Sequence, residues 1–327
     1  MKSFIIINDY FCIECFQNPF QDTQMSKNID FSVIIPHSNS PHFLPRLLHS
    51  IPSSDKIEIL VIDNSPTPIT KSDIGIEEGY TLLYSSPQKG AGGARNVGID
   101  HAVGKWLIFV DADDYLSENA FETFYSYLND TAEIIYFCSD CIFSDTKEHS
   151  DRSDIFNNMV KDYIAGRIPE SKIRTHFFTP WPKMVSHDLV RRKGIRYDEV
   201  VASNDVYFSM LTGFYASSIK AVDEIVYIAT VNKGSLTMRH DPAVILARFE
   251  VYLRFNCFVC KHGLRKYQRS IMYLLVKALK CNLSTFFTCL GLMVKYRQNP
   301  FVGATKWVGA AINIWRKNHK YQKYITH

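Results

Sequence analysis

The chain has 327 residues, 46% of them hydrophobic and 21% charged, which is an ordinary composition for a globular protein. This length allows one large α/β domain or two smaller ones. No apolar run reaches the roughly 18 residues that a membrane-spanning helix requires, so no such helix is predicted.

The net charge of +4 conceals an asymmetry between two parts of the chain. Residues 251–327 contain 14 Lys and Arg and no Asp or Glu, whereas the preceding residues contain 23 basic and 33 acidic side chains. We therefore expect two regions with different partners. Residues 1–27 show neither organised periodicity nor a cleavable signal sequence, so a loose extension is predicted there, with Met25 as an alternative start of translation.

Six of the eight cysteines form C-x-x-C pairs, namely Cys12/Cys15, Cys138/Cys141 and Cys257/Cys260. Two such pairs can form a zinc site. The second pair, however, lies in a strand-like run and the third in a helix-like aromatic segment, and neither has the turn-forming neighbours of a zinc knuckle. We therefore expect buried, reduced thiols of a cytosolic protein rather than structural zinc.

Short apolar runs that alternate with helical spacing indicate an α/β fold with a mostly parallel central sheet flanked by helices. Strands are predicted at residues 31–35, 57–62, 80–84, 106–110, 133–137 and 224–229. Helices are predicted at residues 44–51, 94–103, 117–128 and 201–216, followed by long helices in the C-terminal region. The polar residues 145–175 are predicted to form a loop with a short helix.

Three carboxylates, Asp111, Asp113 and Asp114, directly follow the strand predicted at 106–110. Ligands bind at the carboxyl ends of strands in open α/β sheets, and unpaired acids are too costly to bury in a core. On an extended backbone Asp111 and Asp113 would point to the same side and could hold a hard divalent cation together with phosphate oxygens. The sequence therefore predicts a metal–diphosphate site.

Other origins of these motifs fit less well. An EF-hand would need Gly in place of Leu116 and a helix before the loop. A haloacid-dehalogenase-type phosphatase would need this strand early in the chain and Thr or Val in place of Tyr115. A helix N-cap cluster explains one Asp but not three. The glycine-rich segment from Gly90 has neither Walker A nor G-x-G-x-x-G spacing, which argues against ATP and NAD chemistry.

Asp63 also follows a predicted strand, and the ends of parallel strands share one edge of a sheet. We therefore expect Asp63 and Asp111 to face one crevice, where a carboxylate can accept a proton from a base imide or a ribose hydroxyl. Capping of the next turn is the structural alternative for Asp63.

These segments resemble the inverting family 2 glycosyltransferases of GT-A fold. The resemblance rests on motifs in the same order and spacing, which are VIIP at 33–36, EILVIDNS at 58–65, GAGGARNVGI at 90–99, FVDADD at 109–114, WPKM at 181–184, IRYDE at 195–199 and SNDVYF at 203–208. It extends over residues 30–240 of this chain. It implies a nucleotide-sugar donor, a Mn²⁺ or Mg²⁺ cofactor and a GT-A fold.

The resemblance also implies a set of donor-binding residues. Pro36 and His37 would border the nucleotide base, and Asp63 would read a uracil ring. Arg95 would reach toward the base or the diphosphate. The position after Asp63 is Asn64 where the family usually has Asp, a departure that bears on the choice of uridine.

By the same resemblance, Asp111 would contact the ribose and the metal, Asp113 would ligate the metal that bridges the diphosphate, and Asp114 would be structural. Asp205 matches the aspartate that serves as general base in the family's Glu-Asp motif. It would deprotonate the acceptor hydroxyl for an in-line displacement that inverts the anomeric carbon. Asn204 stands where the family has Glu, which removes a negative charge beside the base.

Two further side chains are candidates for acceptor or phosphate contacts. Trp181 would stack on a sugar face, with a buried core aromatic as the alternative. His240 would contact the metal or a phosphate, with a surface or structural histidine as the alternative.

The predicted organisation is a loose extension at 1–27, a GT-A catalytic domain at 28–240 and a basic, aromatic-rich helical region at 241–327. The predicted activity is inverting transfer of a sugar from a nucleoside-diphosphate donor, favouring UDP, to a hydroxyl of a glycan or lipid-linked acceptor. The alternatives are an inactive nucleotide-sugar or carbohydrate-binding protein and a sugar nucleotidyltransferase. Residues 37–43 lack the Gly-rich basic loop that a nucleotidyltransferase would need.

Beside a transferase body, the basic residues 251–327 favour an anionic membrane surface, with apolar helix faces inserted shallowly. We expect no nucleic acid as partner, although charge alone would allow one. A solvated helical appendage is the alternative. The predicted location is cytoplasmic, peripheral to the inner face of the cell membrane.

Overall fold

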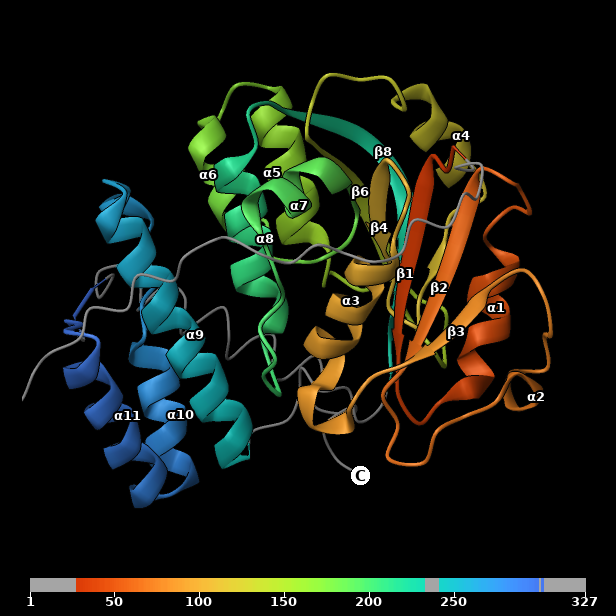
Figure 1. The fold of residues 1–327 in the computed structure, drawn as a ribbon. Coiled ribbons are helices and arrows are strands. Elements are labelled where there is room, and N and C mark those ends of the chain that lie inside the picture. Colours follow the sequence, from red (N-terminus) through yellow and green to blue (C-terminus); the bar gives the residue numbers. More distant parts are fainter. Residues whose placement is uncertain (1–27, 233–240, 300, 303–327) are drawn as a thin grey trace, which may run out of the picture.

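The computed structural model describes residues 28–232, 241–299 and 301–302 (Figure 1). Within them, one eight-stranded sheet has the order β3-β2-β1-β4-β7-β6-β8-β5. The strands are β1 (Phe31–His37), β2 (Ile57–Asp63), β3 (Thr81–Tyr84), β4 (Trp106–Phe109), β5 (Tyr115–Leu116), β6 (Ile134–Phe143), β7 (Lys183–Ser186) and β8 (Ile219–Val231). The sheet and the helices around it confirm the predicted α/β architecture.

Helices cover both faces of this sheet (Figure 1). They are α1 (Leu44–His49), α2 (Lys71–Ile74), α3 (Gly90–His101), α4 (Ala120–Ser126), α5 (Asp154–Ile164), α6 (Glu170–His176), α7 (His187–Lys193), α8 (Asn204–Tyr215), α9 (Pro242–Lys261), α10 (Met272–Cys281) and α11 (Leu283–Lys295). Alternate residues of β1 enter two cores, one shared with α1 and α4 and the other with α3 and α7. Burial on both faces explains why β1 is an unbroken apolar run except for one serine before its terminal Pro-His.

The strands β3, β2, β1 and β4 are mutually parallel, with β1 between β2 and β4. Their carboxyl ends therefore meet at one edge, which places Asp63 beside His37 in the register of β1 and β2. The strand β7 runs antiparallel between β4 and β6, and β8 runs parallel to β6. The antiparallel insertion brings the residues just before β7 next to the end of β4.

The segment predicted as a loop with a short helix is wrong in one respect, because residues 145–175 contain the two helices α5 and α6. On α5, Phe156, Val160 and Tyr163 recur at helical spacing and pack against the core that contains β6. The strands β6 and β8 are also longer than predicted. They extend past the apolar runs because they pair with each other, with register irregularities near Cys138.

The helices α9, α10 and α11 form a core of their own and contact the sheet domain through α8. Val206 and Met210 of α8 pack against Val251, Phe255 and Val259 of α9. This confirms helices in the described part of the C-terminal region. Among the described helices, none combines the length and apolarity needed to cross a bilayer.

The cysteines of the central pair lie three residues apart on β6, so their side chains point to opposite faces of the sheet. Cys141 belongs to the core under α1 and α4, and Cys138 to the core on the other face. The two thiols therefore cannot join in one metal site or one disulfide. Cys12 and Cys15 lie outside the described residues.

The close packing of α3 on β1 gives a test of the fold. A methyl group added at Gly98 would lie 2.4 Å from Ile34 Cγ2 and 3.0 Å from Ile62 Cδ1, both inside the core. We expect Gly98→Ala to lower the free energy of unfolding by about 1–3 kcal/mol in urea titrations.

The matched control is Gly291→Ala on α11, where the added methyl group meets no atom within 4 Å. Helix propensity there should raise stability by up to about 1 kcal/mol. Equal effects of the two substitutions would contradict the packing of α3 on the sheet.

Candidate active site

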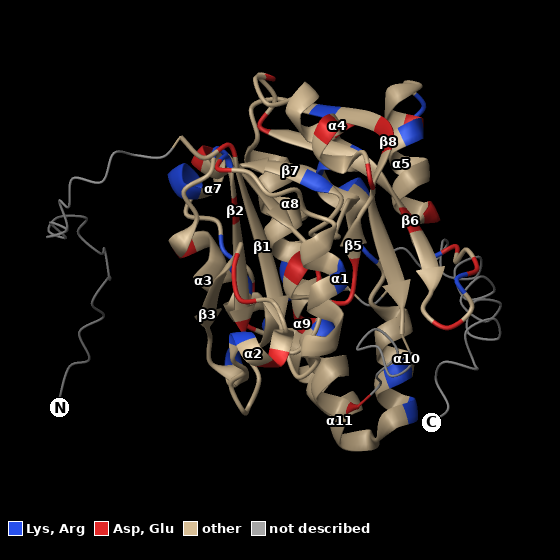
Figure 2. Cartoon of the chain, turned by 90° about the vertical axis from the view of Figure 1, so that its right-hand side faces the viewer, with Lys and Arg blue, Asp and Glu red and all other residues tan. Residues whose placement is uncertain are grey.

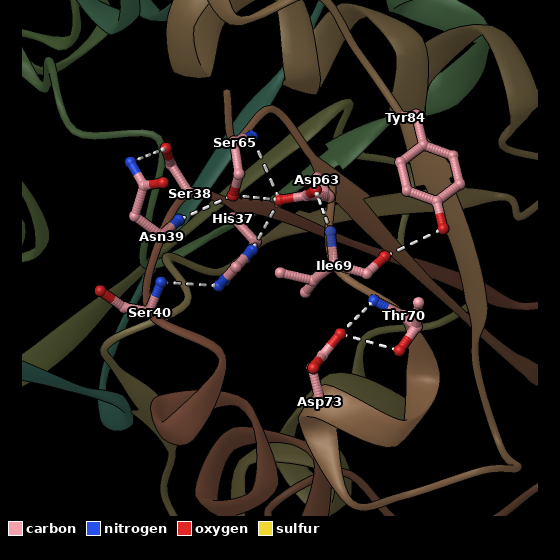
Figure 3. Close-up of polar contacts among 10 residues, drawn as sticks. All are labelled: His37, Ser38, Asn39, Ser40, Asp63, Ser65, Ile69, Thr70, Asp73 and Tyr84. Atoms are coloured by element: carbon pink, nitrogen blue, oxygen red, sulfur yellow. Dashed lines mark hydrogen bonds and ion pairs between the residues drawn. The ribbon is translucent and has the colours of Figure 1, made fainter. Parts of the chain in front are cut away.

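The ends of β1 and β2 are joined by a buried hydrogen bond between His37 and Asp63, with 2.9 Å between Nδ1 and Oδ1 (Figure 3). The other ring nitrogen of His37, Nε2, accepts the backbone N–H of Ser40 at 3.1 Å. Nε2 must therefore be unprotonated, and the neutral ring donates its Nδ1–H to the carboxylate. Pro36 precedes this pair and lies opposite Ile62 in the same register.

Asp63 is only 2% exposed, and both of its carboxylate oxygens accept hydrogen bonds. Oδ1 accepts from the backbone N–H and the hydroxyl of Ser65, and Oδ2 accepts from the backbone N–H of Ile69 at 3.0 Å (Figure 3). Burial alone would raise the pKa of Asp63, but the bonds from Ser65, Ile69 and His37 outweigh it and lower the pKa. Asp63 therefore organises the loops that border the predicted base site, and its contact with a base stays a prediction.

The acidic segment after β4 is a turn rather than the extended backbone that we predicted. The backbone N–H of Asp114 bonds to the carbonyl of Asp111 at 3.0 Å, because β4 ends at Phe109 and the chain reverses toward β5. The predicted reason for Asp111 and Asp113 to share one side is therefore wrong. What directs each carboxylate is its own set of hydrogen bonds.

The carboxylate of Asp111 is held from two sides. Arg95 of α3 donates to Oδ1 at 2.6 Å, and the indole N–H of Trp181 donates to Oδ2 at 3.1 Å. The indole ring stacks on Tyr227 of β8, with centroids 4.7 Å apart and planes 7° apart. Trp181 is 4% exposed, so little of its surface is available to an acceptor sugar, and its observed contact is with Asp111. A sugar contact remains a prediction.

Asp114 is buried, contrary to the prediction that none of the three acids belongs to the core. Tyr227 donates its hydroxyl to Oδ2 at 2.6 Å, and Thr230 donates its backbone N–H to Oδ1 at 2.7 Å. Burial raises the pKa of Asp114 well above its usual range, and Asp113 and Asp111 add to the rise. The partners from β8 make burial affordable, in agreement with the structural role expected for Asp114.

Asp113 accepts a hydrogen bond from the amide of Asn232 at 2.8 Å, and its carbonyl accepts from Arg46 and from the Thr230 hydroxyl. Burial raises the pKa of Asp113, and the neighbouring charge of Asp111 adds to this. Crowded carboxylates of this kind are stabilised by a divalent cation. The described residues contain no group of three acidic, His or Cys side chains that could hold a metal, so further oxygens would have to come from a ligand. Mg²⁺ and Mn²⁺ sites completed by phosphate oxygens have this composition.

Asp205 lies in the first turn of α8, beside Asn204. The guanidinium of Arg95, which binds Asp111, also donates to Asn204 Oδ1 at 2.8 Å and thereby links the acidic turn to this helix. The link requires α3 to approach closely, since a methyl group at Gly92 would lie 2.0 Å from the carbonyl oxygen of Asp198. Burial raises the pKa of Asp205, and the nearby Arg95 opposes the rise.

The structure thus brings together Arg95, Asp111, Asp113, Asn204 and Asp205 and places His37 and Asp63 on the same sheet edge. His240 lies outside the described residues. Sequence reasoning missed Tyr227, Asn232 and Lys183. The first two have no local signal, because their partners lie more than 110 residues away, whereas Lys183 was visible as a lone base inside an apolar motif.

Residues 32–192 match the family model described as Glycosyl transferase family 2. The glycosyltransferase EpsH of Bacillus subtilis is 21% identical over 253 residues, which cover 73% of this chain and 72% of EpsH. The poly(ribitol-phosphate) β-N-acetylglucosaminyltransferase TarS of Staphylococcus aureus is 27% identical over 229 residues. That match covers 62% of this chain and 36% of TarS.

Solved structures agree on the fold. The crystal structure of S. aureus TarS gives a TM-score of 0.54 at 18% identity, over 83% of this chain and 50% of that one. The mannosyltransferase PcManGT of Pyrobaculum calidifontis gives 0.54 at 19% identity, over 92% and 86%. Fold and family match together define a glycosyltransferase with a GT-A-like fold. The chain belongs to glycosyltransferase family 2.

The hydrogen bonds to Asp63 predict an acid-sensitive contribution to stability. Because the folded pKa of Asp63 is lowered, its contribution is present above its unfolded pKa of 3.8 and is lost as the pH falls through the folded pKa. Asp63→Asn should therefore destabilise the protein at pH 7, and the difference from the native protein should shrink below about pH 4.

Urea titrations of both proteins across this pH range measure the difference. Asp73→Asn in the exposed α2 cap is the control, since the pKa of Asp73 is also lowered but its carboxylate contacts only Thr70. A difference between native protein and Asp63→Asn that stays constant with pH would contradict an ionised, hydrogen-bonded Asp63.

Proposed function

We propose that this enzyme transfers a sugar from a nucleoside-diphosphate sugar, with UDP as the nucleotide, to a hydroxyl of a glycan or lipid-linked acceptor. Asp205 is the base, and Asp111 and Asp113 bind the diphosphate through Mn²⁺ or Mg²⁺. The observation that carries the proposal is the double hydrogen bond of Arg95. One buried guanidinium holds Asp111, on the donor side, and Asn204, next to the base, within a single network.

The donor assignment draws support from related proteins. TarS has been solved with UDP-GlcNAc, with a TM-score of 0.52 to this chain, and PcManGT with GDP-Man and Mn²⁺. The pairing of His37 with Asp63 at the strand ends supports a base site at the corresponding edge. An inactive binding protein would have no need of a base, and the family match argues against a nucleotidyltransferase.

The chain's own residues account for the polar steps of an inverting displacement. Asp205 removes the proton of the acceptor hydroxyl, whose oxygen then attacks the anomeric carbon as the bond to the diphosphate breaks. Arg95 and Trp181 fix the rotamer of Asp111, so that this carboxylate is already oriented before a donor arrives. The divalent cation, when bound, supplies positive charge that stabilises the departing diphosphate.

Asp205→Asn tests the assignment of the base. The substitution removes the proton acceptor but keeps the shape of the side chain, so turnover should fall by about 10²–10⁴-fold. Stabilisation by UDP-sugars in the presence of Mn²⁺ should persist. Turnover is measured by release of nucleoside diphosphate, and donor binding by the shift in melting temperature across a panel of nucleotide sugars.

Asp113→Asn is the matched control on the donor side. It should lose the Mn²⁺-dependent shift, whereas Asp205→Asn keeps it. Unchanged turnover of Asp205→Asn would remove Asp205 as the base, and the lack of any shift with uridine or guanosine diphosphate sugars would overturn the proposed function.

We also propose that the C-terminal helices bind an anionic membrane surface. Leu283, Phe287 and Val294 recur along one face of α11 and are 63–78% exposed, while Leu279 at the end of α10 adds to the same apolar set. Residues 251–327 carry no acidic side chain, and basic residues mark α10 in Figure 2. Exposed apolar residues among cations and without acids suit shallow insertion into anionic lipid.

The membrane proposal predicts that the full chain sediments with vesicles containing phosphatidylglycerol and much less with pure phosphatidylcholine. Replacing Phe287 and Val294 by Ser should reduce the bound fraction several-fold, because about 1.5–3 kcal/mol of apolar burial is lost per side chain. The control replaces Ile155 and Ile164 of α5, which are also more than half exposed, by Ser. Equal binding of both double variants would contradict the proposal, as would self-association that involves Phe287.

A further inference from the structure

Lys183, on β7, has its ammonium group buried against the base helix α8. The side chain is nearly inaccessible, and Nζ donates to the carbonyl of Phe177 at 3.3 Å and to the hydroxyl of Ser209 at 3.1 Å. The Ser209 hydroxyl donates onward to the carbonyl of Phe178 at 2.9 Å, so its lone pair receives the lysine. Ser209 follows Asp205 by one helical turn, which puts both side chains on the same face of α8.

The surroundings of this ammonium group are otherwise apolar. Its two hydrogen bonds go to neutral oxygens, and the rings of Tyr136 and Phe177 lie 5.8 and 5.3 Å away. Burial lowers the pKa of Lys183 to about 7, and the charge of Asp205 opposes this fall. A buried cation requires a counter-charge, and the carboxylate that acts on Lys183 is the one assigned as base.

Asp205 is surrounded by several titratable groups from different elements. They are Arg95 on α3, Asp111 in the acidic turn, Lys183 on β7, Tyr197 after α7 and Arg248 on α9. Arg95 is shared with Asp111 and Asn204, and Arg248 also interacts with Asp241. Of these cations, Lys183 is the one whose printed contacts contain no other acid, so its charge acts chiefly on Asp205.

We propose that Lys183 is a positioning residue whose buried ammonium group keeps Asp205 ionised until Asp205 takes the acceptor proton. The inference rests on the proposed function, in which Asp205 is the base. In that step the acceptor O–H bond breaks and its proton moves to Asp205. The oxygen electron pair forms the new bond to the anomeric carbon, and the old bond leaves with the diphosphate. Lys183 exchanges no proton in this step, and its charge favours the return of Asp205 to the carboxylate.

The test is the pH dependence of kcat/KM for the acceptor in Lys183→Met, which retains the length of the side chain but not the charge. The acidic limb should move upward by about one pH unit, so activity at a pH on that limb falls about tenfold while the loss above pH 8 is smaller. Binding of the UDP-sugar with Mn²⁺ should not change. Lys220→Met on β8, whose ammonium pairs with Asp130, is the control and should keep the native profile.

Ser209→Ala provides a second variant if Lys183→Met does not fold. It removes one hydrogen-bond acceptor of the ammonium group and should move the limb in the same direction by a smaller amount. An acidic limb that is unchanged in the variant that folds would overturn the role of Lys183. Absence of turnover in the native chain with every nucleotide sugar would instead contradict the proposed function.

A measurement without substrate completes the test. The unfolded chain binds the Lys183 proton up to about pH 10.5, whereas the folded chain releases it near pH 7. Native stability should therefore contain a component that rises with pH between these values, and Lys183→Met should lack it. An identical slope in the two proteins would mean that Lys183 is not a buried, titrating cation.

Discussion

The site depends on the buried guanidinium of Arg95. Its two terminal nitrogens bind Asp111 and Asn204, and its face lies over the ring of Tyr197. Burial alone would lower the pKa of Arg95, but the charge of Asp111 and further groups raises it, so the cation is permanent. A permanent buried charge needs fixed partners, and this need ties α3, the acidic turn and α8 to one geometry. The glycine at position 92 permits the approach of α3 on which the contact depends.

Around this cation the three aspartates after β4 have different environments. Asp114 is enclosed by β8, Asp111 is oriented by two donors, and Asp113 meets an amide from the end of β8. Raised pKa values at Asp113 and Asp114 follow from burial and from mutual repulsion. Asp63 has the opposite outcome, since several donors lower its pKa. Similar residues at one sheet edge thus acquire different charge behaviour through their partners.

Local signals in the sequence were sufficient for the strands β1, β2 and β4 and for the acids at their ends, because a doubly buried strand is a continuous apolar run. They were insufficient for α5 and α6, whose polar surfaces hide the few residues that pack on the sheet. They also gave the acidic turn the wrong backbone, since an Asp-rich segment can be extended or turned. Tyr227 and Asn232 could not be foreseen, because their hydrogen bonds to the acidic turn span 116 and 119 residues. Trp181 was noticed, but its partner depends on the antiparallel insertion of β7.

The long sequence separation within the acidic turn has a consequence for the order in which the protein matures. The donors that enclose Asp114 belong to β8, the last strand of the sheet to leave the ribosome. Until β8 is docked, three adjacent carboxylates repel one another without compensation, and long-range contacts of this kind form late in folding. A nascent or partly folded chain therefore cannot present an ordered acidic turn, and completion of the sheet and acquisition of the site are one event.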